Sequence, residues 1–148
     1  MNSMYFWGMH PGVEKYKAFE GQYIDTAPSA VSNWLRGKII EVRESHLTLG
    51  FEVRNEMTNP AGLLHGGMIA TMIDDAIGMH LFVLGIEPFH VSVNMHIDYL
   101  GTARLGEEVR VTARIVRKGA RILNASCEVK GITGSLLAAG TVNLIPVR

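Results

Sequence analysis

The order of apolar and polar positions along the chain predicts two β-strands, one long helix and then four more strands. Residues 39–42 and 47–53 are short runs rich in β-branched and other apolar side chains, separated by a polar turn, and each predicts a strand. Residues 55–64 follow as an irregular loop, because Asn59-Pro60 and Gly62 interrupt any regular period. From Gly67 to about Leu84, apolar residues occupy nearly every helical face, which predicts a helix buried on most of its sides.

The second half of the chain has the two-residue period of β-strands. Val91, Val93, Met95, Ile97 and Tyr99 alternate with polar residues. Residues 107–116, 121–129 and 135–147 repeat this alternation, with glycine-containing turns between them. An antiparallel β-sheet wrapped around one long central helix is the simplest architecture for this order. The chain is therefore predicted to be of the α+β class, with this domain spanning residues 37–148.

Residues 1–36 are predicted to form a separate helical and irregular extension that packs on the domain. Pro11-Gly12 is a turn signal, and short helices are expected at about 13–19 and 28–35. The many aromatic side chains argue against a disordered tail and leave two alternatives, a strap over the domain or a wall for an apolar substrate. These aromatic residues are Tyr5, Phe6, Trp7, Tyr16, Phe19, Tyr23 and Trp34.

Composition and charge narrow the functional classes. The 148 residues suit one domain, and 14 basic residues balance 14 acidic ones, which disfavours a nucleic-acid-binding protein. No segment reaches the roughly 18 to 20 apolar residues of a membrane span. The first residues lack the basic and apolar regions of a signal peptide, so a cytoplasmic location is expected. The single cysteine, Cys127, lies in a strand-like stretch and is expected to be a small core residue, not a nucleophile.

Candidate chemistry concentrates at the start of the long helix. His65-Gly66-Gly67 stands at its entrance, where the first N–H groups have no partner within the helix and the helix dipole favours negative charge. Such an end can stabilise an anion or the oxyanion that forms when a carbonyl is attacked. Asp74 follows Gly67 by seven residues, almost two turns, which returns it to nearly the same face. Asp75 points about 100° away and is expected to be solvated or salt-bridged.

This pattern resembles a known family. Asn59-x-x-Gly-x-x-His65-Gly66-Gly67, followed by Asp74, is similar to the hotdog-fold thioesterases of the phenylacetate-pathway type. Val91-Ser92-Val93 and the Leu105-Gly106-Glu107 turn fall in step with that family, so the resemblance covers residues 38–147. It implies a hotdog fold and hydrolysis of an acyl-CoA thioester to a free acid and CoA, with no cofactor and no metal.

The resemblance also implies roles for individual residues. Asp74 matches the acid that acts as nucleophile or general base, and Gly66 with His65 matches the group that polarises the thioester carbonyl. Asn59 matches the residue that positions the carbonyl or the water. Ser92 matches a supporting polar residue beside the acid. The remaining substrate-binding candidates are Gly67 at the helix entrance and, in the turn that meets the CoA phosphates, Arg117, Lys118, Gly119 and Arg121.

The spacing of these residues predicts a dimer. Gly66 and Asp74 are eight residues apart, so on one helix they are separated by about 12 Å along the axis. One thioester needs its oxyanion donors and its attacking group within a few ångströms of the same carbonyl. We therefore expect His65-Gly66 of one subunit to act with Asp74 of its two-fold mate in a homodimer. Pairing of such dimers into a dimer of dimers is a separate expectation.

Several alternatives remain open at this level. A non-catalytic acyl-CoA-binding protein could keep the same pocket, whereas a hotdog dehydratase or hydratase fits the arrangement of His65 and Asp74 poorly. His96 and Asp98 could suggest a metal together with His80 or His90, but their spacing matches no zinc signature, so no metal is expected. The acyl group is left as medium-chain, long-chain or aryl, with a cavity expected beside the aromatic N-terminal segment and Met68, Met72 and Met79.

Overall fold

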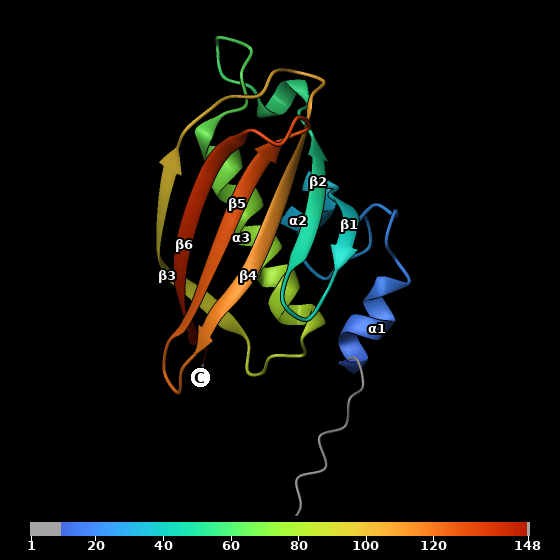
Figure 1. Cartoon of the computed structure of the whole chain (residues 1–148), viewed down its shortest axis with the longest axis vertical. Coiled ribbons are helices and arrows are strands. Elements are labelled where there is room, and N and C mark those ends of the chain that lie inside the picture. Colours follow the sequence, from blue (N-terminus) through green and yellow to red (C-terminus); the bar gives the residue numbers. More distant parts are fainter. Residues whose placement is uncertain (1–9, 148) are drawn as a thin grey trace, which may run out of the picture.

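One long helix packs along a single antiparallel sheet in a computed structural model that describes residues 10–147 (Figure 1). The helix α3 (Gly66–Val83) crosses one face of the sheet, as in the hotdog fold predicted from the sequence. A short 3-10 helix, η1 (Asn55–Met57), lies in the loop before it. The strands are β1 (Lys38–Val42), β2 (Leu47–Glu52), β3 (His90–Tyr99), β4 (Glu108–Lys118), β5 (Leu123–Gly131) and β6 (Leu136–Pro146).

The six strands follow the order β1-β2-β4-β5-β6-β3, and each neighbouring pair is antiparallel. β3 therefore lies at one edge of the sheet, although it directly follows α3 in sequence. The register places Ser92 of β3 opposite Leu144, Leu144 opposite Leu123, and Leu123 opposite Lys118. The start of β3 and the β4–β5 hairpin thus share one end of the sheet, the end where α3 finishes (Figure 1).

The core lies between α3 and the sheet. Met72, Ile73, Ala76 and Ile77 of α3 are completely buried, and the strands contribute alternate residues to the same cluster. A side chain at Gly140 of β6 would come within 3.4 Å of the Ile73 Cδ1 atom, so helix and strand meet closely there. The continuous apolar pattern of residues 67–84 is explained by this burial.

Residues 10–36 contain two short helices, α1 (Pro11–Lys17) and α2 (Ala30–Leu35), and both contact α3. Val13 and Leu35 are buried in the common core. Gly12 lies so close to the end of α3 that a Cβ there would stand 1.9 Å from the Val83 carbonyl oxygen. The predicted helices are confirmed with slightly shifted ends, and Tyr5, Phe6 and Trp7 lie outside the described residues.

Strand boundaries differ from expectation at the β4–β5 connection. The strand predicted to begin at Arg121 begins at Leu123, because residues 119–122 form a tight turn in which the Gly119 N–H donates to the Ile122 carbonyl at 2.9 Å. α3 begins at Gly66, one residue before the predicted start.

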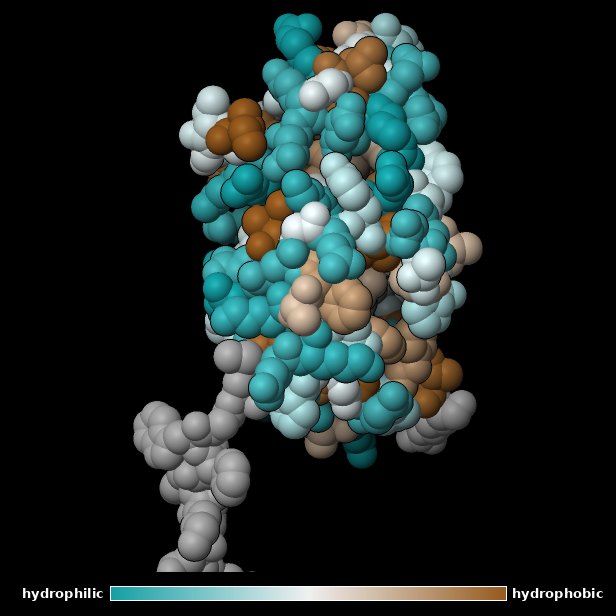
Figure 2. Space-filling model, turned by 90° about the vertical axis from the view of Figure 1, so that its right-hand side faces the viewer, coloured by the Kyte–Doolittle hydropathy of each residue, from teal (hydrophilic) through white to brown (hydrophobic). Residues whose placement is uncertain are grey.

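The alternation in β3 predicts the strand correctly, but three of its apolar side chains stay open to solvent in the protomer, while Met95 and Ile97 pack against the core. Val91, Val93 and Tyr99 are 40%, 51% and 53% exposed. As an edge strand, β3 has a neighbour on one side alone. By contrast, the side that carries α1, α2 and β1 is mainly hydrophilic, with small separate apolar patches (Figure 2). β3 is therefore an edge strand that carries exposed apolar side chains.

Within residues 10–147, no helix is both long and apolar enough to cross a membrane.

Replacing Ile73 with alanine tests the dependence of the fold on α3. The side chain is fully buried, so Ile73→Ala is expected to lower the free energy of unfolding by about 2–5 kcal/mol, through lost burial and the cavity left behind. Urea unfolding followed by circular dichroism measures this. The control Glu128→Ala, on the opposite face of the sheet, should change it by less than about 1 kcal/mol. Equal effects of the two changes would contradict the described core.

Candidate active site

The entrance of α3 presents one free backbone donor. His65 is the N-cap residue, and its Nδ1 accepts a hydrogen bond from the Gly67 N–H at 2.9 Å. A neutral ring that accepts at Nδ1 carries its proton on Nε2, so the side chain keeps one outward donor. The Gly66 N–H finds no acceptor within residues 10–147. The Gly66 N–H and the His65 Nε2–H are therefore the groups available to a ligand oxygen.

Tyr99, at the end of β3, holds this entrance against the sheet. Its hydroxyl donates to the Gly66 carbonyl oxygen at 3.0 Å. A Cβ at position 66 would lie 3.2 Å from the tyrosine ring, so a glycine lets the ring lie flat on the helix entrance. Gly66 is thus in close contact with the protein's own β3.

Asn59 organises the loop that leads to the helix. Its Oδ1 accepts hydrogen bonds from the backbone N–H groups of Ala61 and Leu63, at 3.0 and 3.1 Å. The loop end is fixed by the His65 N–H, which donates to the Met57 carbonyl at 2.9 Å. Since the Asn59 oxygen is used by the loop, the Nδ2 amide is the part of this side chain that remains to meet a substrate or water.

Asp74 and Ser92 form a second group of polar atoms, here called the acid pair. The Ser92 hydroxyl donates to Asp74 Oδ1 at 2.7 Å, which joins the middle of α3 to the start of β3 as expected. Asp74 is exposed in the protomer. The acid pair borders a cleft of about 590 Å³, here called the Asp74 cleft. Its lining is mostly apolar and consists of Tyr16, Gly78, Leu81, Phe82, Gly85, Ile86, Glu87, Phe89, His90, Val91 and Leu144 beside the acid pair.

The protomer does not unite the helix entrance with the acid pair. Gly66 and Asp74 belong to the same straight element, α3, and their eight-residue separation corresponds to about 12 Å along its axis. A single carbonyl group cannot contact both.

The predicted phosphate-binding residues lie on the β4–β5 hairpin. Arg117 and Lys118 end β4, and Gly119 and Arg121 belong to the turn. The strand register sets Lys118 level with Ser92, three strand spacings or about 14 Å away. The hairpin therefore shares the sheet end of the acid pair, not that of the helix entrance.

Comparison with known proteins assigns the family. The model of the thioesterase superfamily matches residues 61–138, which include the second half of the entrance loop, the whole of α3 and the acid pair. The chain belongs to the thioesterase superfamily. A similar curated relative is acyl-coenzyme A thioesterase 13 of Mus musculus, 34% identical over 103 residues, which cover 69% of this chain and 74% of the relative.

Two solved structures of this superfamily are similar in fold and sequence. Thioesterase superfamily member 2 of Mus musculus superposes with a TM-score of 0.67 at 34% identity, covering 72% of this chain and 79% of that one. A phenylacetic acid degradation-related protein of Ralstonia eutropha gives a TM-score of 0.72 at 28% identity, covering 80% and 92%. The resemblance to thioesterases of the phenylacetate type is thereby confirmed.

Asp75 departs from the expectation of a solvated or salt-bridged carboxylate. It points toward α2, where the Ser32 hydroxyl donates to its Oδ1, while its Oδ2 is buried with no partner among the described residues. Burial raises the pKa of this carboxyl, and the neighbouring charge of Asp74 adds to the rise. The sequence could not distinguish the two acids in this way, because α2 approaches α3 only in the folded chain.

The methionines expected near the substrate belong to the core. Met72 is fully buried, Met68 and Met79 pack against the same cluster, and none of the three lines the Asp74 cleft. Aromatic residues line it instead, including Tyr16 of α1 as the N-terminal aromatic content suggested. Gly78 and Phe82 were missed, although their spacing of four and eight residues from Asp74 places them on one helical face.

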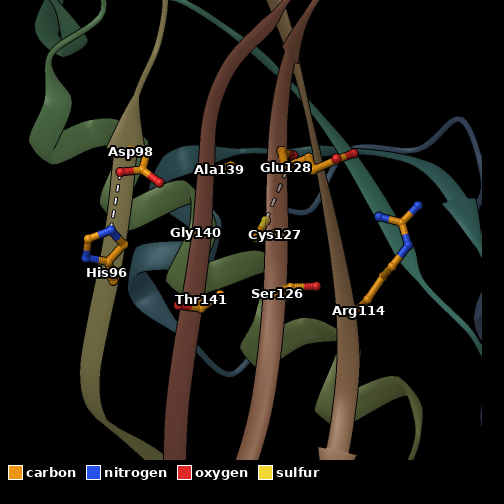
Figure 3. Close-up of a pocket in the computed structure, with 9 residues that line it drawn as sticks. All are labelled: His96, Asp98, Arg114, Ser126, Cys127, Glu128, Ala139, Gly140 and Thr141. Carbon is orange, nitrogen blue, oxygen red and sulfur yellow. Dashed lines mark hydrogen bonds and ion pairs between the residues drawn. The ribbon is translucent and has the colours of Figure 1, made fainter.

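A second hollow, of about 470 Å³, lies on the sheet face away from α3 and holds none of the predicted site residues (Figure 3). His96 and Asp98 pair at 3.2 Å at one side of it, and Arg114 lies at the other. Cys127 is buried at its floor, and this burial raises the pKa of the thiol to about 12, so it is no nucleophile at neutral pH.

The histidines weighed as metal ligands are placed apart from one another. His80 is buried in α3, and its Nε2–H donates to the Arg43 carbonyl at 3.3 Å. His90 contacts the Pro88 carbonyl at the start of β3. Residues 10–147 contain no group of three side chains able to hold a metal ion.

The buried carboxyl predicts a pH dependence of stability. Because burial raises the pKa of Asp75 above its unfolded value of about 3.9, the folded state binds more protons, and stability falls as pH rises between the two values. Asp75→Asn keeps an acceptor for Ser32 and removes the charge. It is expected to raise the melting temperature at pH 8 and to give a smaller gain, or none, at pH 4. A gain that grows on acidification, in calorimetry at both pH values, would contradict this.

Proposed function

We propose that this protein hydrolyses acyl-CoA thioesters to a free acid and CoA. The observation that carries the proposal is the acid pair, a carboxylate held by Ser92 at the border of a mostly apolar cleft. A carboxylate beside an apolar channel suits a substrate with a reactive carbonyl and a hydrocarbon group. Membership of the thioesterase superfamily and similarity to an acyl-coenzyme A thioesterase support the same reaction.

Each group has a defined part in the proposed reaction. Asp74 acts as the base that takes a proton from water, or as the nucleophile itself, so that oxygen adds to the thioester carbon. The Gly66 N–H, at the positive end of α3, stabilises the oxyanion, and His65 and Asn59 supply further donors. Collapse of the tetrahedral intermediate breaks the C–S bond, and the CoA sulfur leaves and takes up a proton. With water as the attacking group this step gives the free acid; if Asp74 attacks, the anhydride formed between the acyl group and Asp74 is hydrolysed by a water molecule in a second step, which restores the carboxylate. Ser92 keeps the carboxylate oriented toward the cleft.

This reaction requires two protomers, because α3 separates its oxyanion donor from its acid. β3 carries contacts to both: Ser92 near its start bonds Asp74, and Tyr99 at its end bonds Gly66. β3 is also the open edge of the sheet, with apolar side chains uncovered. Antiparallel pairing of β3 with a second copy would continue the sheet and cover them.

The register of that pairing follows from the two contacts. A two-fold pairing of β3 centred on His96 sets Ser92 opposite the partner's Tyr99, because the bulge between Ser92 and Asn94 takes up one residue. Residues opposed in an antiparallel pair have Cα atoms about 4.5–5.5 Å apart. The acid pair of one protomer then faces the helix entrance of the other, which gives two composite sites per dimer. Association of such dimers into a tetramer remains an expectation from the resemblance.

The β4–β5 hairpin is proposed to meet the phosphates of CoA. Arg117, Lys118 and Arg121 concentrate positive charge at the sheet end that holds Ser92, and the Gly119 turn lets the backbone approach. The pantetheine arm spans the remaining distance, about 14 Å within one sheet. Gly67 leaves room at the helix entrance, since it carries no side chain.

A dehydratase or hydratase is disfavoured by the same geometry. Such chemistry needs a histidine and an acid acting on one acyl chain, whereas His65 uses Nδ1 to cap α3, far along the helix from Asp74. A non-catalytic protein that binds acyl-CoA would have the same pocket but would not hydrolyse the thioester. Measurement of turnover therefore distinguishes it from the proposed enzyme.

Hydrolysis of acyl-CoA esters is expected to depend on Asp74. Asp74→Asn should lower kcat/KM by about 10²–10⁴-fold, because the amide can neither accept the proton nor attack. Thiol release from a panel of acyl-CoA esters measures it. Asp75→Asn is the matched control, since it alters the adjacent acid that faces α2, and its kcat/KM should stay within threefold of wild type. If Asp75→Asn lost activity and Asp74→Asn retained it, the chemistry would belong to Asp75. If the wild-type protein bound acyl-CoA tightly but did not hydrolyse it, a non-catalytic binding protein would be favoured.

Mixed dimers test the composite site. An Asp74→Ala chain combined with a Gly66→Val chain should regain about half of the wild-type activity per dimer, because one of its two sites then contains both intact groups. Each variant alone should be inactive, and differently tagged chains allow purification of the heterodimer. Inactivity of purified heterodimers whose fold is intact by circular dichroism would refute a site shared between subunits.

A further inference from the structure

Gly78 stands at an unusual place for a glycine. It lies in the interior of α3, one turn after Asp74 and one turn before Phe82, on the face that borders the Asp74 cleft. Glycine inside a helix costs about 1 kcal/mol relative to alanine. A Cβ at this position would meet nothing within 4 Å, so no contact inside the protomer excludes a side chain. Packing within the protomer therefore does not explain why a glycine occupies position 78.

The cleft beside Gly78 combines polar and apolar walls. Asp74 and Ser92 supply polar atoms on one side of Gly78, while Leu81, Phe82 and Phe89 present hydrocarbon. Glu87 and His90 add two polar side chains to the lining. Phe89 and Phe82 are 73% and 51% exposed in the protomer. An acyl group whose carbonyl lies at the acid pair would extend past Gly78, and its hydrocarbon chain would then lie against apolar side chains.

Tyr16 of α1 forms a fixed wall of the cleft beyond Gly78. Its ring centroid is 5.5 Å from that of Phe82, in a tilted arrangement typical of packed aromatic pairs. The helix that carries it is held by the buried Val13 and by the contact of Gly12 with the Val83 carbonyl. The far wall of the cleft is therefore built on an anchored element.

We propose that Gly78 and Tyr16 determine the acyl-chain length that the site accepts, an inference that rests on the proposed thioester hydrolysis. Gly78 keeps open the passage from Asp74 along α3, and Tyr16 with Phe82 closes it. From Asp74 to Phe82 the helix rises about 12 Å. An extended chain advances about 3.4 Å per three bonds, so an unbranched acyl group of about ten carbons fills the passage. The preferred substrate class is medium-chain acyl esters.

The test compares kcat/KM of the full-length protein for acetyl-, octanoyl-, decanoyl- and hexadecanoyl-CoA by thiol release. Wild type should favour the octanoyl and decanoyl esters. Gly78→Leu should lower the ratio of decanoyl to acetyl kcat/KM by at least tenfold, since each methylene excluded from an apolar pocket costs about fourfold to tenfold. Tyr16→Ala should raise the ratio of hexadecanoyl to decanoyl kcat/KM. The control Glu14→Leu places an exposed leucine on α1 outside the cleft and should leave both ratios unchanged.

Melting temperature and oligomeric state show whether a change in chain-length preference comes from unfolding or from loss of the dimer. Gly78→Ala should raise the melting temperature by about 2–5 °C, because alanine is the better helix former and nothing crowds it. Its decanoyl to acetyl ratio should also fall, so the loss cannot come from unfolding. A Gly78→Ala or Gly78→Leu chain that elutes as a monomer would assign the glycine to the dimer interface and overturn the proposal, as would unchanged ratios.

The experiment distinguishes failure of the proposed thioester hydrolysis from failure of the proposed chain-length role of Gly78. Wild type that hydrolyses none of the esters refutes the proposed function, whereas active wild type with Gly78 variants of unchanged preference refutes the specificity role alone. In the absence of turnover, the ratio of dissociation constants for decanoyl- and acetyl-CoA, measured by calorimetry in wild type and Gly78→Leu, gives the same test of the cleft. Equal ratios in the two chains would then overturn the assignment of Gly78.

Discussion

The burial of α3 against the sheet is the constraint on which the rest of the structure depends. Residues such as Met72, Ile73 and Ile77 remove most of the helix surface from water and fix its position across the strands. What remains open is a narrow stripe, and the polar and small residues of the helix gather there. Because that stripe includes both the helix entrance and Asp74, the packing that stabilises the fold also orients the candidate chemistry.

Asp74 and Asp75 are neighbours on α3, but their side chains face different parts of the molecule because successive residues of a helix are about 100° apart. Asp74 faces the cleft and is held by Ser92 from β3, whereas Asp75 faces inward and receives the Ser32 hydroxyl from α2. Burial raises the pKa of Asp75, so its ionised form contacts α2 at some cost in stability. The two acids can be changed independently, which makes each a control for the other.

The open edge at β3 links fold to function. A sheet that ends at this strand leaves apolar side chains in water and the Gly66 N–H remote from the Asp74 carboxylate. The proposed pairing of a second copy along β3 would change both, because the contacts of Ser92 and Tyr99 lie near opposite ends of that strand. In this proposal the dimer completes a surface and a catalytic site in one step.

The sequence by itself determined the elements and the motif. Two-residue and helical periods located every strand and α3 to within about two residues, since these periods follow directly from backbone geometry. The His65-Gly66-Gly67 entrance, Asp74 and Ser92 were also selected as candidates from the sequence, through spacing and resemblance. Only the tertiary structure decided that the Asp75 Oδ2 atom is buried, that methionines belong to the core while Tyr16 and Gly78 border the cleft, and that β3 is an edge strand. Each of these features depends on contacts between segments that are distant in sequence. Local sequence patterns do not predict such contacts.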